Sequence, residues 1–465
     1  TMFALVMITT GIITSIHGAP SMAEYGLSLV VIYLIVAVVF LIPSSLISAE
    51  LATGWPEDGG VYVWVKEAFG ERLGFVAIWQ QWMETVIWFP SIMTMTVALG
   101  FYAFNPALGD NSWFVFVSVN VLFWSLTGIN LLGMQASGVI ATIGTLLGRI
   151  FPILFMTVLA IIYLAKGNPS ETRLSLDNLL PDFSDIGLLS FAVGAFFTFA
   201  GIEVSACNAA SAKNPRRNYP IAIIISASIA LVLSTLIALS IAIVVPQDQI
   251  SVDEGVMQAI ERILNVAGIG WMLPYAGLLI VVGILGEVNN WIPAPTRGLL
   301  VAGRDGAVSP YWQHVNRHAS HSRILIFQAI IVSAISTILL FFEVEIAFWV
   351  MNIVPTMLYL IMYFLMFAAG VRLRYTHPHI PRRYKVPFGN AGIWTLAVVG
   401  TVAGVAGICF SFIPPKITQA DDHVAYIIAV ASGFIVFGIL PFIVFGCRRP
   451  GWKTAFPENE DNQPG

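Results

Sequence analysis

Apolar residues along this chain form runs that are too long for the helices of a soluble domain. The stretches Leu27 to Leu41, Ile221 to Val245 and Val424 to Phe445 approach or exceed the roughly 20 apolar residues that a helix needs to cross a bilayer. Polar borders between such runs predict twelve transmembrane helices. The expected spans are residues 2–20, 27–52, 73–102, 113–130, 139–165, 185–211, 219–245, 271–297, 323–342, 346–371, 391–413 and 424–446. The pattern therefore predicts an all-α polytopic membrane protein.

Two of these spans contain residues that interrupt a membrane helix. Residues 9–20 hold two glycines, several hydroxyl side chains and a proline, and residues 194–206 hold two glycines followed by Glu203. A broken helix is tolerated in hydrocarbon only where protein or a water-filled cavity covers its free backbone groups. Interruptions at matching positions of two halves are typical of the binding site of an inverted-repeat transporter. The alternative for either span is a close helix crossing built from small residues.

The backbone groups freed at such breaks define the predicted ligand. A half-helix that starts after the first break would point free amides at a carboxylate, and one that ends at the second would point free carbonyls at an ammonium group. An α-amino acid carries both groups on one carbon. We therefore predict carboxylate contacts at Thr14, Ser15 and Ile16. We predict amino-group contacts at Phe199, Ala200 and Ile202.

Composition excludes several other classes of protein. Hydrophobic residues make up 57% of the chain and charged residues only 10%, against about 25% charged residues in soluble domains. The formal net charge of −4 and the lack of long basic runs give no footprint for nucleic acid. The three cysteines show no paired spacing, so no disulfide, metal site or redox role is predicted.

The distribution of basic residues predicts the orientation in the membrane. With both termini in the cytoplasm, seventeen of the 22 Lys and Arg residues fall on the inner side, four on the outer side, and Arg149 within a span. The outer four are Lys166, Arg173, Arg262 and Lys416. One long outer loop, residues 251–266, has apolar residues at helical spacing and predicts a short amphipathic helix outside the membrane.

Two segments resemble the amino acid–polyamine–organocation transporter superfamily. Residues 48–64, followed by Ala68-Phe69-Gly70, resemble its second-span signature, and residues 201–205, leading into 213–220, resemble its sixth span and following loop. Within the superfamily, the likeness is to bacterial glutamate/γ-aminobutyrate antiporters. The resemblance implies two inverted five-helix repeats (residues 1–165 and 166–371), two added helices (372–446) and a cytoplasmic tail (447–465). It also implies no cofactor, and alternating access by rocking of spans 1, 2, 6 and 7.

Motif positions extend the resemblance to single residues. Glu203 and Glu287 match acidic residues near the transport path of that family, and Tyr359 and Tyr363 match its pair of tyrosines. The first break departs from the family, because His17 and Gly18 stand where relatives carry an aromatic and an acidic residue.

A charge near the bilayer centre is costly and needs a reason. Glu203 is expected to sense substrate charge or a proton, with a buried acid bonded to backbone amides as the alternative. Glu287 is expected either to be protonated in the site or to pack a polar stripe. Trp291 is predicted to close over the substrate, unless it serves packing. His17 is predicted to gate access by titration, unless it is a satisfied core donor.

Arg149 lies in the fifth span at a level where sodium-coupled relatives of this fold hold an ion between spans 1, 5 and 8. We predict that its guanidinium takes that role and makes transport independent of sodium. The alternative is an arginine that reaches the interface or pairs with Glu84 in the third span.

The sequence thus predicts a secondary active antiporter in the bacterial inner membrane. It would exchange an extracellular glutamate-like amino acid for an intracellular amine such as γ-aminobutyrate, in functional coupling to an amino acid decarboxylase and with a role in acid resistance. A proton-coupled symporter or uniporter of the same fold is the nearer alternative. A channel would need a continuous polar stripe, and a membrane enzyme would need convergent catalytic groups, so both are less favoured.

Overall fold

The computed structural model describes most of the chain as helix. The described residues are 6, 9–11, 13–14, 16–57, 59–133, 144, 146–181, 186–204, 215–318, 320–342, 344–415 and 423–453, and they contain no strand. The predicted contact Ser15 and the tail residues 454–465 lie outside them.

The α-helices follow the apolar runs. They are α2 (Ala19–Ala23), α3 (Leu29–Val36), α4 (Ile42–Gly54), α5 (Val61–Phe69), α6 (Glu71–Phe101), α7 (Ser112–Leu131), α9 (Phe151–Ala165), α10 (Ile186–Phe199), α11 (Pro215–Val244), α12 (Gly255–Val266), α13 (Leu273–Trp291), α14 (Ala294–Arg304), α15 (Ser322–Ser336), α16 (Val344–Thr376), α17 (Gly389–Ser411) and α18 (His423–Gly446). Two π-helical turns, η2 (Ala37–Leu41) and η4 (Leu146–Ile150), lead into α4 and α9. Short 3₁₀ turns lie in several connections.

Ten helical segments of the described chain are long and apolar enough to cross a membrane. They correspond to ten of the twelve predicted spans, with α3, η2 and α4 forming one continuous span and η8 (Gly270–Met272), α13 and α14 forming another. The two remaining predicted spans, the first and the sixth, consist of shorter helical pieces. The prediction of an all-α polytopic membrane protein is confirmed.

Both predicted helix breaks are present. In the first span, helical structure reaches Ile13 and resumes only at Ala19, where α2 begins. In the sixth span, α10 ends at Phe199 and a single 3₁₀ turn follows at residues 202–204. Gly201 adopts a φ of 102°, a conformation that favours glycine and cannot continue an α-helix. The sequence feature that suggested the second break is therefore also its structural cause.

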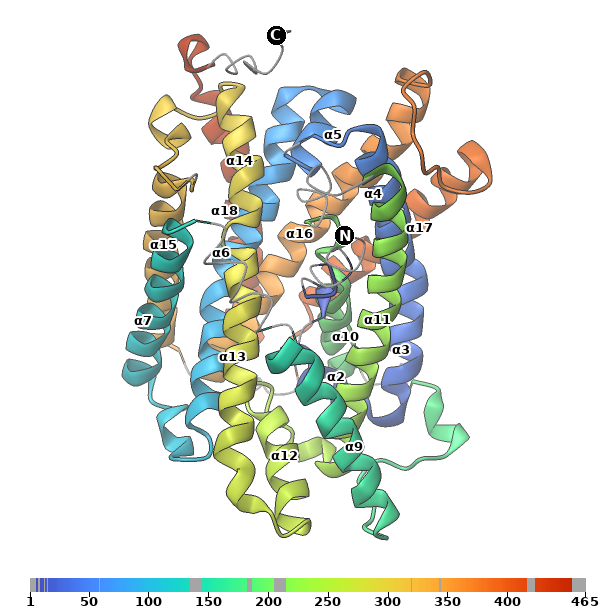
Figure 1. Ribbon diagram of the computed structural model, residues 1–465, viewed down its shortest axis with the longest axis vertical. Helices are drawn as coiled ribbons and strands as arrows, with labels where there is room; N and C mark the ends of the chain where they lie inside the picture. The colour runs from blue at the N-terminus through green and yellow to red at the C-terminus, as the bar shows by residue number, and fades with distance from the viewer. Residues whose placement is uncertain are drawn as a thin grey trace, which may run out of the picture.

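The long helices stand roughly parallel, with α6 near the centre of the bundle (Figure 1). The apolar core of α6 is 89% buried, whereas that of α18 is only 11% buried. A helix that is apolar on every side and covered by protein belongs to the middle of a bundle, while α18 presents its apolar surface outward, where lipid would lie. The central helix α6 packs along most of its length against α16.

The two ends of the bundle carry different structural elements. The helices α5 and α14 and the end of α18 share one end, and α12 lies at the opposite end (Figure 1). At the α5 end, Lys66 pairs with Asp305 at 2.6 Å and Arg448 pairs with Glu71 at 2.7 Å. The predicted outer-loop helix is confirmed as α12, which buries its apolar face beside α11 and α13. The assignment of the α5 end to the cytoplasm stays a prediction.

The second-span signature has a structural role at the α5 end. The carboxylate of Glu50 accepts hydrogen bonds from Arg374 Nε at 2.8 Å and Nη2 at 2.5 Å, and from the Val386 amide at 2.7 Å. This bidentate pair ties α4 to α16 and to the connection before α17. Gly59 and Gly60 adopt positive φ angles in the turn that precedes α5, so the paired glycines of the motif are needed for the chain to reverse there.

Candidate substrate site

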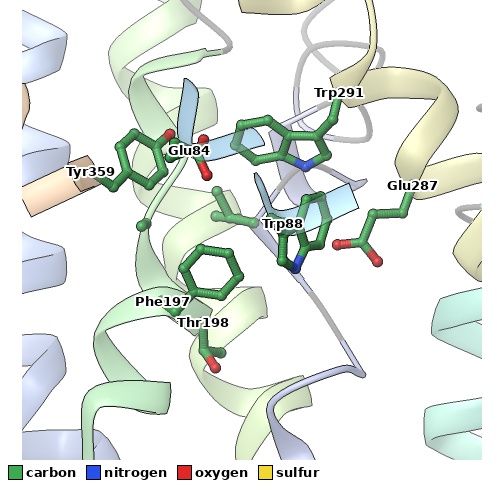
Figure 2. A pocket seen from close by; sticks show the side chains of 9 residues that line it. Glu84, Trp88, Phe197, Thr198, Glu287, Trp291 and Tyr359 are labelled. Atoms are coloured by element: carbon green, nitrogen blue, oxygen red, sulfur yellow. The ribbon is translucent and has the colours of Figure 1, made fainter. Parts of the chain in front are cut away.

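A small buried cavity lies between the two helix breaks (Figure 2). It is lined by Ile13, Glu84, Trp88, Phe197, Thr198, Ala200, Glu287, Trp291 and Tyr359. Ile13 ends the helical part of the first span and Ala200 follows the end of α10, so both breaks border the same space. About 20 Å³ is open to the centre of a water molecule, which is enough for one or two waters and too little for an amino acid. A substrate can therefore enter only if the lining side chains move.

Aromatic rings form one wall of the cavity. The ring of Trp88 meets that of Trp291 edge to face at 6.0 Å and that of Phe197 at 5.7 Å, and Trp291 meets Tyr359 at 6.4 Å. These contacts link α6, α10, α13 and α16 around the site. The faces of such rings attract cations as well as apolar groups. The predicted position of Trp291 over the site agrees with its place in this wall.

Glu203 anchors the second break through a hydrogen-bond network. Its carboxylate accepts hydrogen bonds from Gln81 Nε2 at 2.9 Å, from the Tyr359 hydroxyl at 2.6 Å and from the Tyr363 hydroxyl. The Tyr363 hydroxyl in turn accepts a hydrogen bond from the Gly201 amide at 2.7 Å. The two tyrosines are one helical turn apart on α16, so both face the same carboxylate. The network holds the non-helical segment against α6 and α16.

Arg149 joins the first break to α13. Its guanidinium donates to the carbonyl of Gly11 and forms an ion pair with Glu287. Arg149 is only 1% exposed. The expected alternative partner, Glu84, was wrong: the guanidinium extends from η4 toward α13, and the carboxylate that meets it there is Glu287.

His17 lies beside the aromatic wall. Its ring nitrogen Nε2 is 3.2 Å from the Ser91 hydroxyl, which also accepts a hydrogen bond from Asn352 Nδ2 at 2.6 Å. The His17 ring packs against Phe348 at 4.9 Å and against Trp88 at 6.1 Å. The imidazole is therefore a partnered core group that connects the first span to α6 and α16.

At both breaks, some backbone groups have no backbone partner among the described residues. Within the described part of the chain, the amides of Ile16 and Gly18 donate to no backbone carbonyl, and no backbone amide outside the helices donates to the carbonyls of Phe199 or Ala200. Unpaired backbone groups at a buried break are costly unless a ligand or water binds them. The hydroxyl of Thr14 is also buried without a partner in the structure.

The structure divides the predicted site residues into two groups. Ala200, Glu287, Trp291 and Tyr359 line the cavity. The others stand next to it in the breaks or behind its wall, namely Thr14, Ile16, His17, Arg149, Phe199, Ile202, Glu203 and Tyr363. Sequence reasoning missed Gln81 as a partner of Glu203, and it expected Glu84 to face the bundle or a partner such as Arg149, without assigning it to the site. Gln81 and Glu84 are three residues apart on α6 and so lie on one face of the helix. This spacing was the sequence signal that could have placed them together.

No group of three or more His, Cys, Asp or Glu side chains suited to a metal ion occurs among the described residues. Among the described residues, the ionisable groups around the cavity include three carboxyls (Glu84, Glu203 and Glu287), the guanidinium of Arg149 and the imidazole of His17. These groups can bind the charges of a small zwitterion.

A bundle of membrane-spanning helices with two broken helices around a small occluded cavity is the architecture of a secondary transporter. The sequence profile of the family described as amino acid permease matches residues 1–439. The chain belongs to this family of membrane transporters, which are not enzymes. The predicted membership in the amino acid–polyamine–organocation superfamily is thereby confirmed.

Several relatives match over nearly the whole chain. An uncharacterized transporter of Legionella pneumophila is 36% identical over 95% of this chain and 95% of its own length. A glutamate/γ-aminobutyrate antiporter of Lactococcus lactis is 29% identical over 96% of this chain and 90% of its own. A probable agmatine/putrescine antiporter of the same species is 23% identical over 94% of this chain and 93% of its own.

Proposed function

We propose that the protein is a secondary active antiporter that exchanges an amino acid resembling glutamate for an amine such as γ-aminobutyrate. The observation that carries this proposal is the meeting of both helix breaks at one occluded cavity with acidic and aromatic walls. Free amides at the first break suit a carboxylate, and free carbonyls with nearby carboxyl groups suit an ammonium group. Relatives whose names specify antiport of glutamate, γ-aminobutyrate, agmatine or putrescine support the same class of exchange.

The occluded cavity also supports alternating access. The lining residues Glu84, Trp88 and Tyr359 are 1–3% exposed, so the site is shut off from both ends of the bundle. In the proposed cycle, the segments with the breaks, together with α3, α4 and α11, rock against the remaining helices. This division rests on the predicted inverted repeats, residues 1–165 and 166–371.

Arg149 supports sodium-independent transport in this proposal. Its guanidinium stands between Gly11 of the first span and Glu287 of α13. A fixed cation at this point would offset the Glu287 charge and occupy the first half-helix carbonyl that an ion would otherwise bind. The same protein could then exchange substrates without a bound sodium ion.

The biological setting follows from the chemistry of the exchange. Decarboxylation of glutamate consumes a proton, so import of glutamate and export of its amine would remove protons from the cytoplasm when a decarboxylase works beside the transporter. We therefore propose a role in acid resistance. We also propose an inner-membrane location with both termini in the cytoplasm, which rests on the basic residues predicted for the inner side.

Counterflow in proteoliposomes tests the antiporter proposal. Vesicles preloaded with an amine should take up labelled glutamate faster than empty vesicles. A proton-coupled symporter or uniporter would instead respond to a pH gradient and show no dependence on the internal amine.

A further inference from the structure

Glu84 is a buried acid on α6 that the transport scheme above does not use. It is 1% exposed and lines the cavity together with Trp88, one turn further along the helix. Figure 2 shows its carboxyl group directed into the space between Tyr359 and the two tryptophans. The side chain thus reaches the volume where a substrate would lie.

The carboxyl of Glu84 differs from the other two acids of the site in its partners. Glu287 is paired with Arg149, and Glu203 accepts hydrogen bonds from Gln81, Tyr359 and Tyr363. By contrast, Oε1 of Glu84 is buried and has no hydrogen-bond partner among the described residues, and no described Lys, Arg or His pairs with its carboxyl. A buried carboxyl without a partner is costly, so a ligand that supplies a donor there gains both the contact and relief of that cost.

The surroundings of Glu84 select for a cation. Trp88, Trp291 and Tyr359 line the same cavity, and their ring faces attract a positive charge. The guanidinium of Arg149, which stands next to the site, points at Glu287 and Gly11. A primary ammonium group, which is small and has three donors, suits this combination of carboxyl and rings.

We propose that Glu84 is a specificity-determining residue that binds the ammonium group of the transported substrate. The proposal rests on the proposed function in one respect only, namely that a small zwitterionic or cationic substrate occupies this cavity. It deepens that function, because it assigns recognition of the amine to a carboxyl on α6 in addition to the backbone groups of the breaks.

Ligand pairs that differ only in the ammonium group test this assignment. We would measure the dissociation constants of γ-aminobutyrate and γ-hydroxybutyrate, and of glutamate and 2-hydroxyglutarate, by quenching of tryptophan fluorescence in the purified protein. The wild-type protein should prefer each ammonium ligand. In Glu84→Gln this preference should fall about tenfold or more, because a hydrogen bond to a charged group is lost. Glu84→Asp, which keeps the charge, should retain an intermediate preference.

Thr85→Ser is the matched control. Thr85 is buried next to Glu84, donates to the Trp82 carbonyl at 2.7 Å and does not line the cavity. The Thr85→Ser variant should therefore prefer ammonium ligands over their hydroxyl analogues as strongly as the wild type does. If Glu84→Gln keeps the wild-type preference, or the wild type has none, the assignment is wrong. If Glu84→Gln does not fold, an unchanged preference in Glu84→Asp overturns the assignment and a several-fold loss supports it. Failure of the antiporter proposal appears separately, as absence of counterflow in wild-type vesicles whose ligand preference is intact.

Discussion

The hydroxyl of Tyr359 on α16 donates a hydrogen bond of 2.6 Å to the carboxylate of Glu203, directly after the second helix break. Tyr359 also lines the cavity, whereas Glu203 stands behind it. This relationship places one side chain between the proposed substrate and the acid that holds the non-helical segment. Binding of a substrate in the cavity can thereby change the hydrogen bond that holds the non-helical segment at the second break.

The tyrosine pair gives the first prediction. Tyr359→Phe removes one hydrogen bond to Glu203 and should weaken glutamate binding about tenfold, since hydrogen bonds to charged groups contribute about 1.5–3 kcal/mol. Tyr363→Phe removes a bond to Glu203 and the acceptor of the Gly201 amide, so it should have the larger effect. Tyr426→Phe is the control, because Tyr426 donates to the Ser411 carbonyl away from the site. Equal affinities in all three variants would contradict the network.

The second prediction concerns the buried ion pair. Arg149→Met should abolish transport and lower the free energy of unfolding by about 3–5 kcal/mol, because Glu287 would remain buried without its partner. The double variant Arg149→Met with Glu287→Leu should recover much of the thermal stability without recovering transport. Uptake by the wild-type protein should not depend on sodium. A sodium requirement, or normal transport by Arg149→Ala, would refute the proposed role of the guanidinium.

Close packing of glycines gives the third prediction. Gly148 in η4 lies against the backbone of Gly283 in α13, so that a Cβ atom at Gly148 would overlap Gly283 Cα and N. Gly148→Ala should therefore lower the free energy of unfolding by about 1–3 kcal/mol through overpacking. A Cβ atom added at Gly128 in α7 would enter open space. Gly128→Ala should therefore leave the melting temperature nearly unchanged. A similar melting temperature for both variants would show that η4 and α13 are not in this contact.

The fourth prediction is a pH dependence at the α12 end. Burial, followed by the charges of Asp253 and Asp110, raises the pKa of Glu254 from 4.5 to about 8. Burial also raises the pKa of Asp253. The folded state therefore binds more protons than the unfolded state between these values, and stability is lost as pH rises from about 4.5 to 8. In Glu254→Gln, the fall of the melting temperature between pH 5 and 8 should be smaller. An identical pH profile in both proteins would exclude this contribution.

Much of the fold follows from the sequence because the membrane restricts the options. A helix satisfies its backbone groups within one segment of chain, so long apolar runs predict spans, and clusters of glycine and hydroxyl residues predict where the spans break. Gly201 illustrates this, since its positive φ ends the helix at the residue that suggested the break. The family resemblance likewise pointed to Tyr359 and Tyr363, which both donate hydrogen bonds to Glu203.

The partners of the buried charges could not be predicted in the same way. Arg149 meets Glu287 and not Glu84 because the choice depends on the rotation of η4 and α13, which are packed through Gly148 and Gly283. Hydropathy does not report that rotation. For the same reason the sequence did not reveal that Gln81 contacts Glu203 or that Glu84 enters the cavity.

Exchange across a membrane is the most direct test of the account. We would reconstitute the purified protein in vesicles preloaded with γ-aminobutyrate, other amines or buffer alone, and measure uptake of labelled glutamate from pH 5 to 8. The account predicts that an internal amine strongly stimulates uptake, with or without sodium. Uptake that is the same in amine-loaded and empty vesicles, for every amine of the panel, would contradict the proposed antiport.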